Sequence, residues 1–301
     1  MNFTKQFWVL TLSFIVGIAT FFLFVVFDKD EELGSEQPIN EEESVVDDEQ
    51  PQETTDDRDQ GTDQENQEEQ SHNDQTQPAR GDTNEDVEFI WGVDSASRTT
   101  EDFYQCVTTN FGEPEIWGRY LGDKEGVSYG LTTDEINLLH DQRIQILVIY
   151  NHFTDGTTYE RGVQEAEQAI ALANELSIPE GVALFANVEP EYPIDADFIT
   201  GWYDTLAESV YEAGIYGDFS EDGDIHHAFQ QAASEQAEIQ DHTVIWTHQP
   251  QIGITTEENA PEYQPAAPEG SLAWGWQYGI ESEACNIDTN LFSSELVDYL
   301  W

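Results

Sequence analysis

Four apolar runs of the sequence end in side chains that could do chemistry. The run Val182–Tyr192 reads VALFANVEPEY, so Asn187 and Glu189 stand near its end and Pro190 stops a strand there. The other three runs end in an acid, in a Tyr-Asn pair and in a Trp-Gln-Tyr triplet: Phe89–Asp94, Ile144–Asn151 and Leu272–Tyr278. In sheets built from β/α units, chemistry collects at the C-terminal tips of the strands, because the strands hold the loops there rigidly. We therefore expect the four tips to surround one pocket.

The carboxylates of this set could act as an acid and a charge-stabilising partner. We assign Glu189 as the general acid, Asp94 as the second catalytic carboxylate and Asp288 as a third candidate. Such a group can protonate a glycosidic oxygen and stabilise the positive charge that develops on the sugar ring. On position alone, Glu189 could equally be a solvated loop residue or a helix cap. Glu191 would take over the acid role if the strand ended later.

Amide and aromatic side chains at the same tips could bind a sugar. Asn187 and Gln277 could hydrogen-bond sugar hydroxyls or an N-acetyl group, and Asn151 is placed in the same substrate-binding set. Aromatic rings pack well on the flat C–H faces of sugars. The aromatic candidates are Tyr120, Tyr150, Tyr216, Trp246, Trp274, Trp276 and Tyr278. We expect about half of them to be core residues, and Trp276 and Tyr150 to be exposed in the pocket.

The elements that must position these side chains alternate along the chain. Helical patterns separate the predicted strands, which implies parallel βαβ units. Thr132 and Glu135 stand at capping-box spacing at the start of one helix. The strand candidates are Phe89–Val93, Glu115–Tyr120, Ile144–Tyr150, Val182–Val188, Gly214–Tyr216, Thr243–Trp246 and Leu272–Tyr278. A count close to eight, with helices thinning out after the fifth strand, predicts an α/β fold of the irregular TIM-type (β/α) barrel class.

The composition divides the chain into three parts. Residues 1–27 hold the apolar run Phe7–Phe27, which is long enough to span a bilayer as a transmembrane helix. Its end, FFLFVVF, lacks the small residues that a signal peptidase prefers, so we expect an uncleaved signal anchor. Residues 28–87 are polar and acidic and predict a disordered linker, and residues 88–301 hold the barrel domain. With the amino end in the cytoplasm, the barrel of this single-pass cell-membrane protein would lie outside it.

The charge balance excludes some partners. The chain has 63 acidic and 9 basic residues, a formal net charge of −54. It therefore lacks the electrostatic attraction that drives binding to nucleic acid or to anionic lipid headgroups. An acid excess of this kind is typical of proteins that work in high salt, or outside a cell at alkaline pH.

Neither the cysteines nor the histidines predict a metal site, and we expect no cofactor. Cys106 and Cys285 have no second thiol at zinc or redox spacing. They could form one disulfide outside the membrane or be two separate buried residues. Asp218–Asp224 resembles half a calcium loop, but Phe229 stands where the final ligand should be, so we expect a plain acidic turn. The histidines His226, His227, His242 and His248 are expected to lie on the surface or in loops.

Several motifs together resemble a known family. They are Asp94 in GVDSAS, Arg119-Tyr120 in WGRYLG, the helix start LTTDE, Val148–Asn151 in LVIYN, Gly214–Gly217 in GIYG, Trp276–Tyr278 in GWQYG, and Asp288 in NIDTN. The pattern, over about 88–301, resembles the bacterial glycoside-hydrolase-like domain of unknown function, which is similar to the family 25 muramidases, lysozymes with a TIM-like barrel. In those muramidases an acid after the first strand, an Asp-x-Glu after the fourth and a Trp-Gln-Tyr on the last strand line the sugar groove. The resemblance implies the same roles for Asp94, Glu189 and Trp276–Tyr278, with Asn187 in place of the Asp.

The sequence thus favours a membrane-anchored, extracytoplasmic glycoside hydrolase-like protein that acts on cell-wall polysaccharide, peptidoglycan above all, by carboxylate acid catalysis. The alternative is a non-catalytic glycan-binding or cell-wall scaffold domain, which Asn187 favours because an amide cannot ionise. A non-glycan enzyme on the same barrel is a third alternative, since a fold does not fix a function.

Overall fold

The computed structural model describes residues 87–301. The predicted transmembrane run Phe7–Phe27 and nearly all of the predicted linker lie outside these residues. None of the helices within 87–301 has both the length and the apolar character needed to cross a bilayer.

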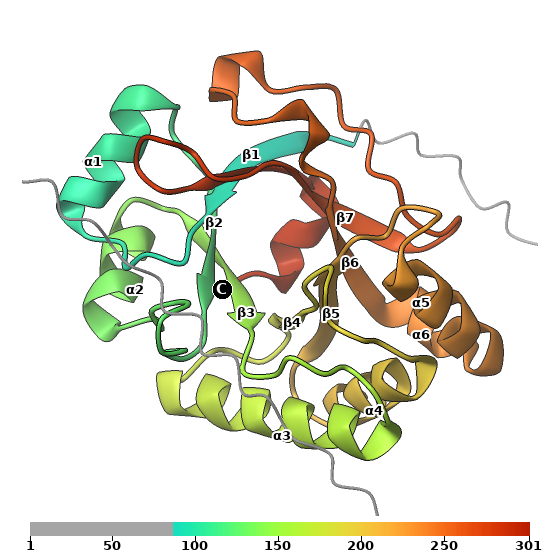
Figure 1. Ribbon diagram of the computed structural model, residues 1–301. Helices are drawn as coiled ribbons and strands as arrows, with labels where there is room; N and C mark the ends of the chain where they lie inside the picture. The colour runs from blue at the N-terminus through green and yellow to red at the C-terminus, as the bar shows by residue number, and fades with distance from the viewer. Residues whose placement is uncertain (1–86) are drawn as a thin grey trace, which may run out of the picture. The chain divides into compact units, whose positions relative to one another are not determined.

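Eight strands close into one barrel in the order in which they occur in the chain (Figure 1). Neighbouring strands from β1 to β7 pair in parallel, whereas β8 runs antiparallel to both β7 and β1. The strands are β1 Phe89–Asp94, β2 Ile116–Tyr120, β3 Gln145–Tyr150, β4 Ala183–Asn187, β5 Glu212–Gly217, β6 Thr243–His248, β7 Leu272–Gly279 and β8 Asp288–Ser293. The predicted α/β barrel is confirmed, and its irregularity lies in the antiparallel closing strand.

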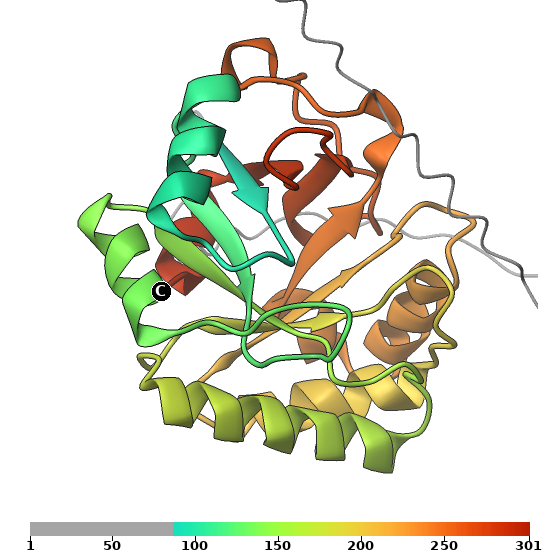
Figure 2. The same cartoon turned by 60° about the vertical axis from the view of Figure 1, so that its left-hand side comes forward.

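Helices cover the outside of the barrel between β1 and β6. They are α1 Glu101–Asn110, α2 Thr133–Asp141, α3 Tyr159–Leu176, α4 Ala196–Ala207, α5 Asp224–Glu235 and α6 Ala237–His242. After β6 the connections hold short 3-10 turns, Pro250–Ile252 and Glu257–Asn259, instead of α-helices. The helices α3 and α4 lie side by side in both views (Figures 1 and 2). Gly162 and Gly201 allow this approach, since a Cβ on either one would overlap the backbone of the facing helix.

The alternation of side chains along each strand separates two apolar layers. Inside the barrel lie Leu147, Ile149, Phe185, Trp246 and Phe292 with their neighbours. Between the strands and the helices lies the larger cluster, which includes Trp117, Ile146, Val148, Trp202 and Phe229.

The C-terminal segment closes one end of the barrel. Leu296 and Leu300, on and after the 3-10 helix Ser294–Tyr299, pack with the interior cluster, and this segment lies within the ring of strands in Figure 1. Trp301 exchanges backbone hydrogen bonds with Ile146 near the start of β3. The N-terminal ends of the parallel strands are therefore closed, and the C-terminal ends are left for a site.

Two details differ from the sequence-based expectations. The strand Asp288–Ser293 was missed, because its first residues are the polar Asp288, Thr289 and Asn290, and only pairing on both edges makes this segment a barrel strand. The expected capping box forms only in part. Thr132 Oγ1 accepts from the backbone N–H of Glu135, but the Glu135 carboxylate turns inward to Arg119 instead of back to the helix start.

Candidate active site

A cavity of about 150 Å³ opens at the C-terminal end of the barrel strands. It brings together eight of the residues proposed from the sequence: Asp94, Tyr120, Asn187, Glu189, Tyr216, Trp246, Gln277 and Asp288. It also contains three others, His248, Ile280 and Glu281. Three of the four chosen strand tips therefore line one pocket, those of β1, β4 and β7, whereas the tip of β3 contributes no residue to it.

Asp94 lies at the bottom of the cavity as the last residue of β1. Its side chain is buried, and its Oδ1 atom accepts hydrogen bonds from Asn290 Nδ2 at 2.8 Å and Gln277 Nε2 at 3.0 Å. Burial raises the pKa of Asp94 to about 6, against the opposing effect of these two hydrogen bonds, and the nearby charge of Glu189 adds to the rise. At neutral pH Asp94 is thus an ionised carboxylate held by two amide groups.

Asp288 begins β8 on the same wall of the cavity. Its Oδ1 atom accepts from the backbone N–H of Glu281 at 2.7 Å, and its Oδ2 atom lies 3.5 Å from Gln277 Nε2. Burial, and next the charge of Asp94, raise the pKa of Asp288 to about 8. At neutral pH Asp288 therefore carries a proton for most of the time.

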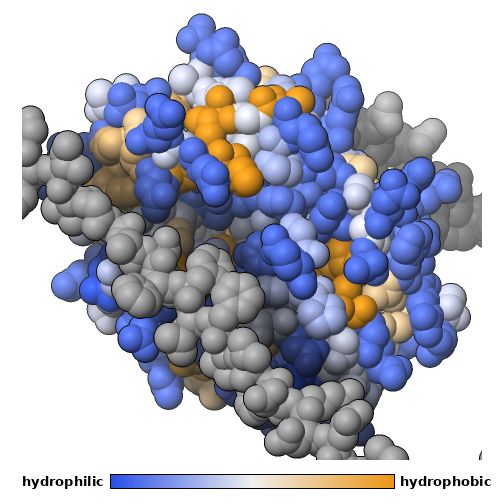
Figure 3. All heavy atoms as spheres, in the orientation of Figure 1, coloured by the Kyte–Doolittle hydropathy of each residue, from blue (hydrophilic) through white to orange (hydrophobic). Residues whose placement is uncertain are grey.

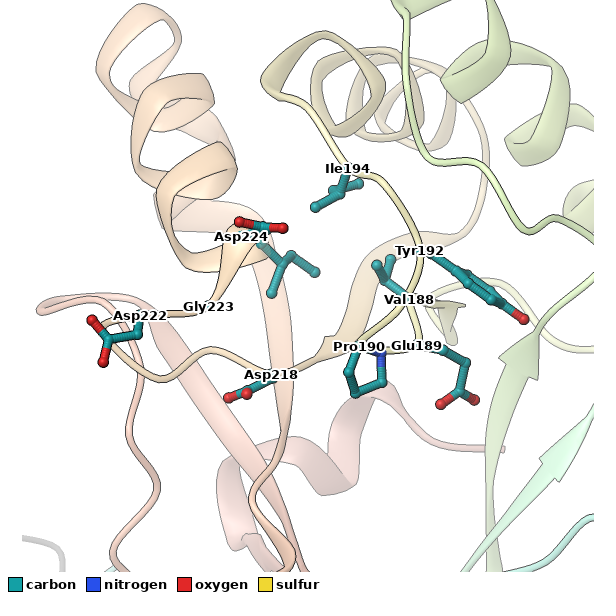
Figure 4. Close-up of a pocket in the computed structure, with 10 residues that line it drawn as sticks. Val188, Glu189, Pro190, Tyr192, Ile194, Asp218, Asp222, Gly223 and Asp224 are labelled. Atoms are coloured by element: carbon teal, nitrogen blue, oxygen red, sulfur yellow. The ribbon is translucent and has the colours of Figure 1, made fainter.

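Glu189 stands two residues beyond the end of β4, between two hollows. Asn187, the last residue of β4, is buried and donates from Nδ2 to Glu189 Oε1 at 2.8 Å. On its other side Glu189 borders a second hollow of about 210 Å³, between the segment after β4 and the loop before α5 (Figure 4). Glu189 is half-buried, so its carboxylate can reach a ligand in the cavity.

The second hollow is acidic on its far wall. Asp218, Asp222 and Asp224 line it opposite Tyr192 and Ile194 (Figure 4). Within residues 87–301, no group of three or more His, Cys, Asp or Glu side chains is arranged to hold a metal ion.

A polar network crosses the cavity floor from β5 to β7. Tyr216 donates its hydroxyl proton to Gln277 Oε1 at 2.7 Å, and His248 Nδ1 lies 2.8 Å from the same oxygen and 2.8 Å from the Tyr216 oxygen. Burial raises the pKa of Tyr216 well above its usual range, so the hydroxyl stays a donor. Both amides predicted to bind sugar, Asn187 and Gln277, are thus engaged with protein partners.

The structure corrects the placement of four residues that the sequence put in the pocket. Tyr150, Asn151, Trp276 and Tyr278 are all buried and do not line the cavity. The expectation that Trp276 and Tyr150 are exposed there is wrong. Neighbouring residues on a strand point to opposite faces. Because Gln277 faces the cavity, Trp276 and Tyr278 on either side of it face the outer layer.

Three of the four residues have hydrogen-bond partners within the protein, and Trp276 packs its ring against Tyr263 and Tyr278. Tyr150 donates to Glu165 Oε2 on α3 at 2.6 Å, and Asn151 donates to Ser128 Oγ at 3.0 Å. Tyr278 accepts from Trp91 Nε1 at 2.9 Å. Of the other aromatic candidates, Tyr120, Tyr216 and Trp246 line the cavity, and Trp274 packs against Tyr299.

His248 and Asn290 are functional candidates that the sequence analysis missed. His248 was expected on the surface or in a loop, but it is the last residue of β6 and lines the cavity. The signal was available, because the run Thr243–His248 also ends in a polar group, like the four runs chosen. Asn290 lies on the strand that was not predicted and could not have been found by the same rule.

A disulfide holds one wall of the cavity. Cys106 on α1 and Cys285 in the β7–β8 loop are joined, with their Cα atoms 5.8 Å apart. The same loop is tied to the segment after β1, since Ser95 Oγ donates to the Asn286 carbonyl at 2.7 Å and Asn286 Nδ2 donates to Ser97 Oγ at 2.8 Å. These contacts fix the loop that carries Glu281 and leads into Asp288.

Comparisons with known proteins agree with this architecture. The family model described as "Rv2525c-like, glycoside hydrolase-like domain" matches residues 114–291, more than half of the chain. No curated protein matches the chain. Among solved structures, an uncharacterized protein of B. stearothermophilus is 42% identical with a TM-score of 0.69, over 70% of this chain and 100% of that one.

Two further structures share lower similarity. The Tat-secreted protein Rv2525c of Mycobacterium tuberculosis is 13% identical with a TM-score of 0.45, over 67% of this chain and 93% of that one. A family 25 glycosyl hydrolase from Bacillus anthracis is 14% identical with a TM-score of 0.45, over 69% of this chain and 92% of that one. On the family match and the 42% identical structure, the chain belongs to the family of Rv2525c-like, glycoside hydrolase-like domains.

Proposed function

We propose that the domain hydrolyses a glycosidic bond of cell-wall polysaccharide, peptidoglycan above all, with Glu189 as the general acid. The observation that carries this proposal is the meeting of Glu189, Asp94 and Asp288 in one open cavity at the C-terminal end of the barrel. Glycosidic cleavage needs a carboxylic acid beside the leaving oxygen and negative charge near the ring that becomes positive.

Glu189 and Asp94 differ in burial and in hydrogen bonding. Glu189 Oε1 accepts the amide N–H of Asn187, so a proton carried by Glu189 resides on Oε2 and is available to a leaving oxygen. Asp94 is buried below it and is ionised above a pH of about 6. Proton transfer from a positioned acid is worth about 10²–10⁴ in rate, and the Asp94 charge acts where little water screens it.

One aromatic residue of the cavity fits a sugar ligand. Tyr120 on β2 is only partly buried and lines the cavity with the carboxylates, and such a ring packs on the C–H faces of a sugar. Tyr216 and Trp246 line the same cavity but are buried, so they leave little ring surface for stacking. We expect the cavity to hold one sugar ring of the ligand and the hollow beyond Glu189 to hold the neighbouring sugar ring.

We also propose that the domain is held at the outer side of the cell membrane. The apolar run Phe7–Phe27 supports a signal anchor, and the acidic stretch 28–87 supports a linker that spans the distance to the wall. The disulfide between Cys106 and Cys285 favours an oxidising compartment, because reduced thiols prevail in the cytosol.

The test is release of reducing sugar from purified peptidoglycan by the full-length chain. Glu189→Gln keeps the size of the side chain and the acceptor for Asn187 but removes the acid, so we expect turnover to fall by at least about 100-fold. Glu191→Gln is the matched control, because Glu191 is exposed and lies two residues away. Loss of activity in Glu191→Gln with full activity in Glu189→Gln would move the acid role to Glu191. The assay is run at low and at molar salt, since an anionic domain is repelled by anionic wall polymers unless salt screens the field.

The second candidate is a non-catalytic glycan-binding domain. Asn187 favours it, because the related muramidases have an ionisable Asp at this position. If no sugar is released at any salt concentration and the protein still sediments with peptidoglycan, this glycan-binding alternative would be supported.

A further inference from the structure

The hydrogen-bond network of the cavity fixes the positions of its protons, starting from Trp246. The indole N–H of Trp246 can only donate, and it lies 2.9 Å from Asn290 Oδ1. The amide nitrogen of Asn290 must therefore face Asp94, to which it donates at 2.8 Å. Asp94 Oδ1 is thus an acceptor, and any proton on this carboxyl sits on Oδ2.

The orientation of Gln277 follows from that of Asp94. Gln277 Nε2 donates to Asp94 Oδ1 at 3.0 Å, so Gln277 Oε1 faces Tyr216 and His248. An amide oxygen only accepts. His248 Nδ1, 2.8 Å from this oxygen, must then carry a hydrogen. The network accordingly places a hydrogen on Nδ1 of His248, so that the neutral form of the ring is the Nδ1–H tautomer, and this follows from donors and acceptors alone.

The other ring nitrogen of His248 remains for a ligand. Nε2 makes no hydrogen bond with any residue in 87–301, while the ring is only half-buried and lines the cavity with Glu189. In the neutral Nδ1–H imidazole, Nε2 holds a lone pair. His248 thus presents a free acceptor to the space in which the proposed reaction takes place.

Three other polar groups of the cavity are poorly suited to accept a proton from water. Asn187 is an amide. Asp94 is 3% exposed, and its Oδ1 atom is already occupied by two donors. Asp288 holds its own proton at neutral pH, because burial raises its pKa to about 8.

We propose that His248 is a catalytic residue of the hydrolysis proposed above, on which this inference rests, and that its Nε2 atom is the base for the attacking water. The water oxygen forms the new bond to the anomeric carbon while the bond from that carbon to the leaving oxygen breaks. The electron pair of the broken bond stays on the leaving oxygen, which takes the proton of Glu189. The proton of the water passes to Nε2, and His248 becomes an imidazolium with Gln277 and Tyr216 still bound at Nδ1.

Nuclear magnetic resonance on the ¹⁵N-histidine-labelled full-length chain tests the tautomer without reference to activity. Two-bond ¹H–¹⁵N spectra distinguish a protonated from an unprotonated ring nitrogen, and loss of the signal in His248→Asn assigns it. We expect a neutral imidazole with the hydrogen on Nδ1. A neutral ring with its hydrogen on Nε2 would overturn the proposal.

A pair of substitutions separates chemistry at Nε2 from positioning at Nδ1. His248→Asn keeps an amide N–H that can donate to Gln277 but has no atom at the Nε2 position. We expect it to lower kcat by about 10²–10⁴-fold, the usual contribution of a general base, with little change in KM. His248→Gln places an amide near Nε2 that cannot take a proton, so it should lose kcat as well. His227→Asn, on the exposed first turn of α5, is the matched control and should behave as the wild type.

Each outcome decides between the two roles or between this inference and the proposed function. Wild-type turnover in His248→Asn would reduce His248 to a positioning residue and overturn the base role. If the wild type cleaves peptidoglycan but its neutral His248 carries the hydrogen on Nε2, the base role of His248 is overturned and the proposed hydrolase function stands. A wild type that neither cleaves nor binds peptidoglycan removes the proposed function, and with it the base.

Discussion

At the scale of single residues, the cavity contains two buried carboxyl groups, Asp94 and Asp288, whose environment disfavours the ionised form. Asp94 and Asp288 share Gln277 Nε2 as a donor, and the charge of Asp94 opposes the ionisation of Asp288, while the charge of Glu189 opposes that of Asp94. Their pKa values of about 6 and about 8 compare with the ordinary value of 3.8. Holding these two carboxyl groups close together therefore lowers the free energy of unfolding at neutral pH, as is common for catalytic sites.

The raised pKa values of Asp94 and Asp288 predict how the free energy of unfolding depends on pH. A carboxyl whose pKa is higher in the folded than in the unfolded state stabilises the fold below its unfolded pKa and loses that contribution as the pH rises through the folded value. The free energy of unfolding should therefore fall between pH 4 and pH 8. Asp288→Asn mimics the protonated acid, so at pH 8 it should be more stable than the wild type by about 1–3 kcal/mol. Near pH 4 the two proteins should be similar.

Urea unfolding at pH 4, 6 and 8 measures this difference. The wild type and Asp288→Asn share all other acidic groups, so the comparison cancels the general repulsion of the chain. Parallel pH profiles for the two proteins would contradict the raised pKa of Asp288.

At the scale of elements, a buried ion pair connects the loops that frame the cavity. Arg119 on β2 is fully buried and donates from Nε to Glu135 Oε1 on α2 at 2.6 Å. Its other nitrogens donate to the carbonyls of Ser95, after β1, and Tyr129, after β2. Glu135 Oε1 also accepts from the backbone N–H of Thr99 at 2.7 Å. One side chain thus fixes the connections after β1 and β2 to each other and to α2.

Removal of one partner of this pair should be costly. Arg119→Met leaves the Glu135 carboxylate buried without its counter-ion, so we expect the free energy of unfolding to fall by about 3–5 kcal/mol. The double variant Arg119→Met with Glu135→Leu removes that charge and should recover part of the loss. It should still lie below the wild type, because two backbone carbonyls and one N–H lose their partners.

Urea unfolding of the three variants measures the coupling. Arg98→Met is the control, since Arg98 lies 3.7 Å from Asp123 in a pair whose two side chains are about half or more exposed, and such pairs are worth about 0–1 kcal/mol. If Arg119→Met were no more destabilising than Arg98→Met, the bracing role of Arg119 would be wrong.

At the scale of the whole molecule, negative charge dominates. The chain carries a formal net charge of −54 with 9 basic residues in all, and the described surface in Figure 3 is largely hydrophilic. Like charges at this density repel one another more strongly in the compact state than in the unfolded chain. The fold is therefore expected to depend on screening by salt.

Thermal unfolding of the full-length chain in increasing NaCl tests this expectation. The Debye length falls from about 10 Å at 0.1 M to about 3 Å at 1 M, so most of the repulsion should disappear and Tm should rise over this range. Sucrose at matched osmolality is the control, since it stabilises by exclusion and leaves the charges unscreened. A Tm that is constant in NaCl, or that rises equally in sucrose, would argue against electrostatic stabilisation.

The sequence alone determined the fold class and the position of the site along the chain. Alternating apolar runs and helical patterns are local properties, so they revealed seven of the eight strands and the strand tips that carry Asp94, Asn187 and Glu189. The capping residue Thr132 and the close fit of Tyr159–Leu176 to a helix were local in the same sense.

Only the tertiary structure decided which side chains of each tip face the cavity. The pleat and register of the barrel turn Gln277 inward and Trp276 outward, and a shift of one residue would exchange them. The polar strand Asp288–Ser293 becomes a strand through pairing with β7 and β1, which no local pattern shows. The chain of donors from Trp246 through Asp94 to His248 joins residues from four strands, so the proton on His248 Nδ1 depends on contacts that exist only in the closed barrel.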